Sequence, residues 1–69
     1  MTMTEKIVFL ENAGEQRLLL NVVMNDGETF EGRSSYFLDD DFEWCFRLTD
    51  GQGYIVPVDD IASMTVISA

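Results

Sequence analysis

The sequence predicts an all-β fold, a small five-stranded barrel made by a single domain that spans residues 1–69. Short runs of alternating apolar and polar residues are typical of half-buried strands. Turn-forming residues separate these runs at regular intervals along the chain. A chain of 69 residues is short for a two-sheet sandwich, whereas closure of one small sheet into a barrel would remove its exposed edges.

The N-terminal segment 5–16 allows two interpretations, an extra edge strand over residues 6–10 or a short helix beginning at Thr4. A capping box at Thr4 would need Glu or Gln three residues later, where Ile7 stands instead. The β-branched Ile7 and Val8 favour extended structure. We therefore expect a strand and keep the short helix as the alternative.

Two strands and a turn occupy the next segment. Residues 18–24 alternate as a first strand, and Asn25-Asp26-Gly27 supplies the turn, in which Gly27 can adopt a positive φ. Residues 29–38 then form a long strand, in which Gly32 predicts a bend. The alternation places Phe37 on the more polar face of this strand.

The second half of the chain continues the alternation, with Pro57 predicting an edge position because proline cannot donate a ladder hydrogen bond. Asp59 is expected to cap a single helical turn. The elements in order are a loop over 39–41, strands over 43–49 and 54–58, a helical turn over 59–62 and a last strand over 63–67. The expected core is Leu20, Val22, Phe30, Tyr36, Trp44, Phe46, Val56, Val58, Ile61 and Val66.

Charge is the strongest feature of the composition, because 13 Asp and Glu residues face 4 Lys and Arg residues and the net charge is −9. Nucleic-acid and anionic membrane surfaces attract cations, so we expect no direct nucleic-acid partner and no membrane partner. Such a field favours a basic protein partner, although solubility alone is an alternative reason for it. The four basic residues are far apart in the sequence: Lys6, Arg17, Arg33 and Arg47.

The residues needed for catalysis are missing, so we expect a protein that is not an enzyme and uses no cofactor or metal. There is no histidine, and the one lysine, Lys6, leaves few ways to activate a nucleophile. Asp39, Asp41 and Glu43 alternate like calcium ligands, but Trp44 stands where a calcium loop needs glycine. A solvated acidic loop is the better interpretation.

The lone cysteine and the N-terminus bear on location. Cys45 has no partner for an intrachain disulfide and lies between Trp44 and Phe46, which indicates a small apolar residue in a reducing compartment. The N-terminus lacks the basic and apolar regions of a signal peptide. We expect a soluble cytoplasmic protein.

One acidic loop combines charge with an aromatic side chain and is the candidate binding site. Aromatic anchors dominate interface energetics, and acidic groups around such an anchor would select a basic partner. We expect the partner-binding residues to be Asp39, Asp40, Asp41 and Phe42, with Asp59 and Asp60 contributing at the rim.

The stretch Leu18–Asp41 resembles the first motif of the Sm-like proteins, which have SH3-like barrels, with Gly27, Phe30, Gly32 and Phe37 at matching spacings. The resemblance implies a five-stranded Sm-like barrel and an RNA-binding oligomer. The sequence departs from the family where RNA contacts would lie. Leu38 replaces the motif's aspartate, Phe42 stands in place of an asparagine, and Val58-Asp59-Asp60-Ile61 replaces an Arg-Gly pair.

A second resemblance rests on Asp26-Gly27, Gly32 and the segment 55–61. These residues are similar in arrangement to the YolD-like bacterial barrels and, in outline, to the acidic Rho-binding antiterminator. The latter family binds a basic RNA-handling protein, so this resemblance implies a protein partner.

The favoured function is a non-enzymatic acidic interaction module that docks on a basic, nucleic-acid-binding protein surface as a regulator or inhibitor. The first alternative is an Sm-like RNA-binding oligomer, and the second is a structural subunit of a larger assembly, such as a phage particle. We also expect a homodimer formed through strand edges at 7–10 and 65–67.

Overall fold

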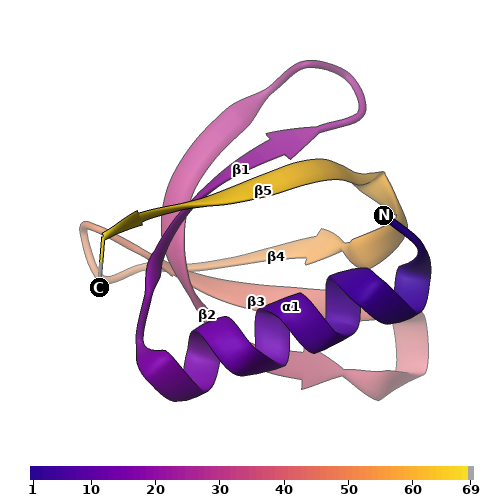
Figure 1. Ribbon diagram of the computed structural model, residues 1–69, viewed down its shortest axis with the longest axis horizontal. Coiled ribbons are helices and arrows are strands. Elements are labelled where there is room, and N and C mark those ends of the chain that lie inside the picture. Colours follow the sequence, from indigo (N-terminus) through magenta and orange to yellow (C-terminus); the bar gives the residue numbers. More distant parts are fainter. Residues whose placement is uncertain (69) are drawn as a thin grey trace.

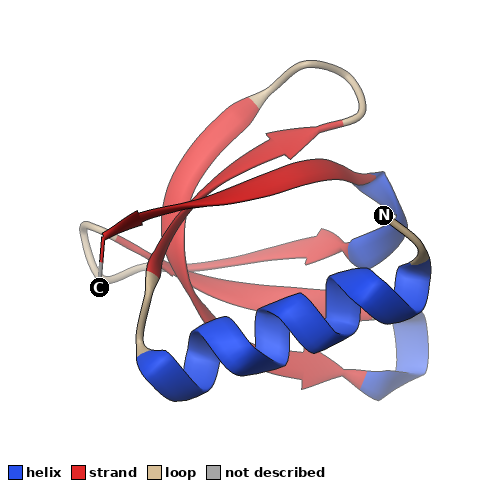
Figure 2. Cartoon of the chain, in the orientation of Figure 1, coloured by secondary structure: helices blue, strands red, loops and turns tan. Residues whose placement is uncertain are grey.

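A helix and a five-stranded antiparallel sheet make up the chain (Figure 1). The computed structural model describes residues 1–68, except for the side chain of Asp39. The helix is α1 (Met3–Gln16), and two 3-10 turns, η1 (Asp39–Asp41) and η2 (Val58–Asp60), lie after β2 and before β5 (Figure 2). The strands are β1 (Leu19–Met24), β2 (Thr29–Leu38), β3 (Glu43–Leu48), β4 (Gly53–Pro57) and β5 (Ile61–Ser68).

The sheet is curved and open, with the strand order β4-β3-β2-β1-β5. The prediction of five strands is confirmed, but that of a closed barrel is wrong. β4 pairs with β3 alone and β5 pairs with β1 alone, so each leaves one edge without a strand partner. Pro57 ends β4, in agreement with its predicted edge position.

The strand expected over residues 6–10 is wrong, because this segment belongs to the 14-residue helix α1. The capping box lies two residues earlier than the one considered at Thr4. The Thr2 hydroxyl accepts from the Glu5 N–H at 3.1 Å, and the Glu5 carboxylate accepts from the Thr2 N–H at 2.8 Å. α1 is also longer than the short helix kept as the alternative.

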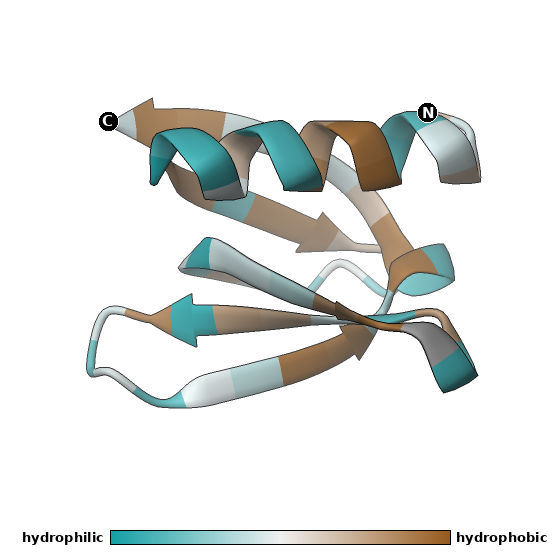
Figure 3. Ribbon diagram, turned by 90° about the horizontal axis from the view of Figure 1, so that it is seen from below, coloured by the Kyte–Doolittle hydropathy of each residue, from teal (hydrophilic) through white to brown (hydrophobic). Residues whose placement is uncertain are grey.

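Burial on the sheet explains why the β-branched residues of α1 do not prevent a helix. Leu10 and Ala13 are buried, and Ile7 packs partly buried against the same core. Tertiary contacts of this kind outweigh the small intrinsic cost of Ile or Val in a helix, a few tenths of a kcal/mol on the usual scales. Figure 3 shows α1 lying along one side of the curved sheet.

A buried hydrogen-bond relay joins α1 to two strands. The Ser34 hydroxyl on β2 donates to the Leu10 carbonyl oxygen at 2.6 Å, and the Trp44 indole N–H on β3 donates to the Ser34 hydroxyl oxygen at 2.8 Å. Ser34 is the buried polar residue among those that the structure describes. The relay satisfies the indole N–H, which burial would otherwise leave without a partner.

A β-bulge reverses the predicted faces of two aromatic residues. The β2–β3 register shifts by one between Ser34 and Tyr36, so the alternation changes phase at Ser35. Tyr36, expected in the core, is 55% exposed. Phe37, expected on the polar face, packs against the core and lies 5.6 Å from Trp44 between ring centroids.

The open edge accounts for a second difference in the core. Val66, expected to be buried, is 50% exposed on β5, which has no strand on its outer side. Phe30 is half-buried, and its ring contacts those of Phe46 and Tyr54 edge to face. The other expected core residues are buried as predicted: Leu20, Val22, Trp44, Phe46, Val56, Val58 and Ile61.

The helical turn predicted over 59–62 lies slightly earlier, at Val58–Asp60. Asp59 is not its cap, because the N-cap position belongs to Pro57 and makes no side-chain hydrogen bond. Within residues 1–68, no helix is long and apolar enough to cross a membrane.

Candidate functional site

Three of the four basic side chains line one pocket, and we call Arg17, Arg33 and Arg47 the arginine cluster. Arg33 on β2 and Arg47 on β3 are directly opposite partners in the antiparallel pair. Arg17 ends α1 in a left-handed conformation, and the Arg33 guanidinium donates a hydrogen bond to its carbonyl oxygen. The three arginines are far apart in the sequence, but the fold brings them to one pocket.

The bulge at Ser35 creates the alignment of two arginines. Nearer the β2–β3 connection, Tyr36 pairs with Cys45, a register that would place Arg33 opposite Leu48 if it continued. The one-residue shift instead brings Arg33 opposite Arg47. Ser35 is exposed and lies in the wall of the same pocket.

The end of α1 lies close to β2 at Gly14. A Cβ atom at this position would lie 3.4 Å from both the carbonyl oxygen and the hydroxyl oxygen of Ser34, which is ordinary van der Waals contact. The close approach carries Arg17, three residues farther along the chain, to the side of Arg33.

The pocket at the arginine cluster has a volume of about 430 Å³. A second hollow of about 290 Å³ shares Arg33 and Arg47 with it. No carboxylate from the described part of the chain lines either hollow. Guanidinium groups with free N–H donors bind phosphate and carboxylate oxygens in pairs, so this arrangement suits an anion. The pocket lining consists of Gly14, Gln16, Arg17, Arg33, Ser34, Ser35 and Arg47.

The residues predicted for partner binding lie at one end of the sheet, around the two 3-10 turns. The Val58 N–H donates to the Phe42 carbonyl oxygen at 2.9 Å, which holds η2 beside the end of η1. We call this region the acidic end, comprising Asp40, Asp41, Glu43, Asp59 and Asp60. The predicted side chain of Asp39 lies outside the described part of the structure.

Phe42 is an exposed aromatic residue within the acidic end. It has a φ of 51° and its side chain is 56% exposed. Its ring makes a T-shaped contact with that of Phe37, at 5.9 Å between ring centroids. The structure therefore brings η2, with Asp59 and Asp60, to the loop that carries Asp40, Asp41 and the exposed Phe42.

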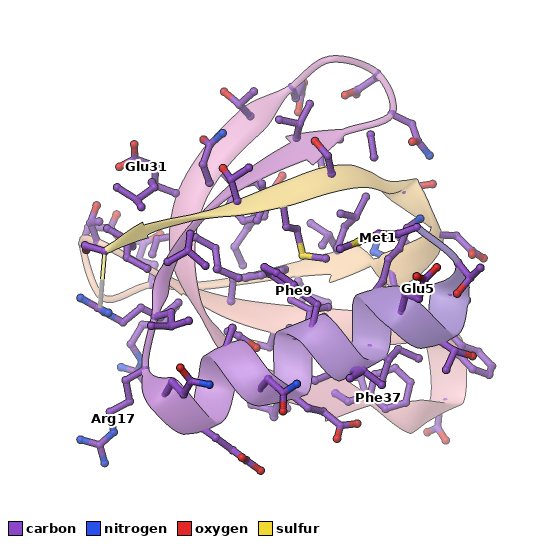
Figure 4. All side chains as sticks on the ribbon, viewed as in Figure 1. Met1, Glu5, Phe9, Arg17, Glu31 and Phe37 are labelled. Atoms are coloured by element: carbon purple, nitrogen blue, oxygen red, sulfur yellow. The ribbon has the colours of Figure 1, made fainter. Side chains whose placement is uncertain are left out.

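The two charged regions are separated along the strands and the helix. β3 begins at Glu43 in the acidic end and reaches Arg47 four residues later, about 13 Å away at the usual rise per residue. Figure 4 shows Arg17 at one end of α1 and Phe37 near the other. No group of three metal-binding side chains occurs within residues 1–68 when the undescribed Asp39 side chain is set aside.

Part of the arginine cluster could have been predicted by pairing the two strands of the expected hairpin. Arg33 and Arg47 are both exposed residues on adjacent strands of a hairpin. Pairing the two strands outward from their connection nearly aligns them, and the bulge completes the alignment. The position of Arg17 depended on the helix, which the sequence interpretation had taken for a strand.

Comparison with known proteins identifies the fold. No family model matches the sequence, and no curated protein matches it significantly. Among solved structures, the chain is similar to a crystal structure of the pleiotropic translational regulator Hfq, with a TM-score of 0.73 and 20% sequence identity. The match covers 96% of this chain and 98% of that chain. The Sm-like fold expected from the sequence is thus confirmed, while no finding supports the YolD-like or antiterminator resemblance.

Proposed function

We propose that this chain is a self-associating RNA-binding protein in which the arginine cluster holds phosphate groups. The observation that carries this proposal is the convergence of Arg17, Arg33 and Arg47 on a pocket in whose lining the described residues place no carboxylate. Its fold is similar to that of a protein described as a translational regulator, which supports RNA as the ligand class. This function is the alternative drawn from the sequence, and it replaces the acidic docking module as the favoured one.

The net charge of −9 does not prevent a phosphate from binding at this site, because the described residues place no carboxylate in the pocket lining and the acidic end is distant and screened. At about 0.15 M salt, electrostatic interactions between exposed charges decay over about 8 Å. The acidic end lies farther from Arg47 than this along β3. A phosphate in the pocket would contact guanidinium groups directly, and this attraction outweighs the repulsion from carboxylates outside the lining.

Self-association through the sheet edges belongs to the same proposal. β4 and β5 each have an unpaired edge, and both carry half-exposed apolar side chains, among them Ile55 and Ile67. Pairing β4 of one copy with β5 of another leaves free edges for further copies, so it produces a ring if the rotation closes. Each added copy brings another arginine cluster, so an assembly offers several phosphate sites.

The test is fluorescence anisotropy with a labelled single-stranded RNA at about 0.15 M ionic strength. Replacement of Arg47 by Gln should weaken binding by about tenfold, because it removes charge-assisted hydrogen bonds to phosphate. Lys6→Gln is the matched control, since it removes the same charge from α1 outside both hollows. Failure of the wild-type protein to bind RNA would overturn the proposal, as would equal losses in the two variants.

The acidic end supports a second candidate function, the docking of a basic protein surface. The hydrogen bond between the Val58 N–H and the Phe42 carbonyl oxygen holds η2 beside the end of η1, where Phe42 offers an exposed ring. We propose contacts from Asp39, Asp40, Asp41 and Phe42, with Asp59 and Asp60 at the rim. This candidate retains a regulatory role without requiring nucleic acid.

A basic peptide distinguishes this second function from RNA binding. Asp40→Asn combined with Asp41→Asn should weaken binding of an arginine-rich peptide with an aromatic-binding apolar residue, and should leave RNA binding unchanged. For peptide binding, Glu11→Gln combined with Glu15→Gln on α1 is the control with the same charge change, and it is not used for RNA because both glutamates lie in the hollow that adjoins the arginine pocket. Equal losses of peptide binding in the two double variants would show that only the net charge matters, and would contradict the acidic end as a specific site.

A further inference from the structure

Carboxylates border the arginine cluster along the sheet. Glu31 is exposed on the same face of β2 as Arg33, two residues away, a distance of about 7 Å. Asp50 is also exposed, in the turn after β3, next to Gly51, which lines the second hollow. A polyanion that continued along the sheet from the cluster would therefore meet negative charge within the screening length.

The helix side of the cluster is bordered in the same way. Glu11 and Glu15 line an adjoining hollow that shares Gly14 and Ser35 with the arginine pocket. Both glutamates are exposed on α1. The three arginines thus form a small basic patch, which carboxylates flank on the helix side and on the sheet side.

A small basic patch flanked by carboxylates favours a single phosphate group over a continuous nucleic-acid backbone. An internal phosphodiester carries one negative charge and has phosphates on both sides, which would lie toward the flanking carboxylates. A phosphate monoester carries about −1.5 to −2 charges at pH 7 and offers three acceptor oxygens. Three guanidinium groups match that charge and number of acceptors better than they match a diester.

The size of the pocket agrees with one nucleotide. Its volume of about 430 Å³ lies at the lower end of the range for small-ligand sites. The last turn of α1 forms one wall through Gly14 and Gln16, and the exposed Ser35 hydroxyl is available as a further donor. Ser34 is already engaged with Leu10 and Trp44.

We propose that the arginine cluster binds the terminal phosphate monoester of an RNA strand rather than an internal stretch of its backbone. This inference rests on the proposed RNA-binding function and names the part of the RNA that the site takes. Arg33 and Arg47 contact the phosphate from the sheet, and Arg17 closes the site from the end of α1.

The experiment compares one single-stranded RNA sequence prepared with hydroxyl ends, with a 5′-phosphate and with a 3′-phosphate. Binding is measured by anisotropy at several salt concentrations for the wild type, Arg47→Gln and the control Lys6→Gln. A nucleoside 5′-monophosphate and the corresponding nucleoside serve as competitors, which separates a free nucleotide from a strand end as the source of the phosphate. Arg33→Gln is a second variant of the cluster, and circular dichroism checks that each variant keeps its fold.

One terminal phosphate is expected to raise affinity about tenfold, and Arg47→Gln and Arg33→Gln should each abolish that gain while Lys6→Gln keeps it. The slope of log affinity against log salt should be near that for one or two phosphate contacts, and the nucleotide should compete where the nucleoside does not.

Each other result overturns a defined part of the account. Equal binding of all three RNAs, with a steep salt slope and a loss in Arg47→Gln, overturns the inference but leaves the proposed function standing. Displacement by the nucleotide without binding of any RNA overturns the proposed function and identifies the site as one for free nucleotides. A terminal-phosphate gain that survives both arginine substitutions overturns the placement at this cluster.

Discussion

Ser34 shows how one buried polar residue fixes the position of a helix. Its hydroxyl connects the Leu10 carbonyl of α1 to the Trp44 indole of β3, and its own backbone lies in β2. The same residue lies against Gly14 at the end of α1, next to the arginine pocket. Packing of the fold and geometry of the candidate site therefore depend on the same contact.

Replacement of Ser34 by Ala should lower the free energy of unfolding by about 1–3 kcal/mol, because the buried Trp44 N–H loses its acceptor. Urea unfolding followed by the fluorescence of Trp44, the single tryptophan, measures this change. Ser63→Ala, at an exposed position, is the control and should change stability by no more than about 0.5 kcal/mol. A similar effect of both substitutions would remove the relay as a source of stability.

At the scale of elements, alternation and turn residues predicted the strands. The errors came from a β-bulge and a helix cap, which such patterns do not reveal. The turn at Asn25-Asp26-Gly27 and the long strand that follows it could be read directly, and Gly27 has a φ of 92°. The face of Tyr36 could not be predicted, because a one-residue bulge reverses the alternation after Ser34. The helix was missed because its capping box is at Thr2 rather than Thr4.

The candidate site was predictable only in part, for the same reasons. The acidic end combines residues from two neighbouring loops, and their charge and one aromatic residue are visible in the sequence. The arginine cluster needs a bulge to align Arg33 with Arg47 and a helix C-terminus to bring Arg17 beside them. Neither feature can be predicted from the composition. The net charge of −9, taken alone, argued against a phosphate site.

Thr2→Ala tests the start of α1, and should destabilise the protein by about 1 kcal/mol at neutral pH through loss of the cap. Hydrogen bonds from the Thr2 backbone N–H and the Thr2 side chain hold the pKa of the Glu5 carboxyl below its ordinary value. The stability from Glu5 is thus present above its unfolded pKa, 4.5, and is lost as pH falls through the lower folded pKa.

Unfolding curves of wild type and Thr2→Ala, recorded from neutral pH to below pH 4.5, check both the loss of the cap and the pH dependence that comes from Glu5. The difference between the two proteins should be largest above pH 4.5 and should shrink as the pH falls. A difference that grows toward low pH would contradict the capping box as the cause. Thr4→Ala, inside the helix and exposed, is the control with the same chemical change.

The whole molecule is electrically uneven, with the arginine cluster at one end of the strands and the acidic end at the other. Its two edges, β4 and β5, are open and partly apolar. A net charge of −9 on each copy opposes association of these edges, whereas backbone hydrogen bonds and apolar contacts favour it. Ionic strength decides the balance, because salt screens the repulsion and leaves the other terms nearly unchanged.

Self-association should therefore increase as salt rises, which sedimentation equilibrium measures. Ile55→Lys places a charge on the edge strand β4 and should lower the average mass at every salt concentration. Val8→Lys makes the same change at a similarly exposed position on α1 and should not lower it. Equal masses for the two variants, or dissociation on adding salt, would contradict association through the strand edges.

Direct observation of the arginine side chains is the sharpest test of RNA binding at the arginine cluster. The chain has three arginines and all three line the pocket, so every arginine Nε–H resonance reports on this site. NMR spectra of the 15N-labelled protein are recorded while a single-stranded RNA with a terminal phosphate is added at about 0.15 M salt. RNA binding at the arginine cluster predicts that all three Nε–H signals shift as RNA is added, while the backbone amides of Phe42 and Asp59 at the acidic end stay in place. Arginine signals that do not move at saturating RNA, with or without shifts at the acidic end, would contradict it.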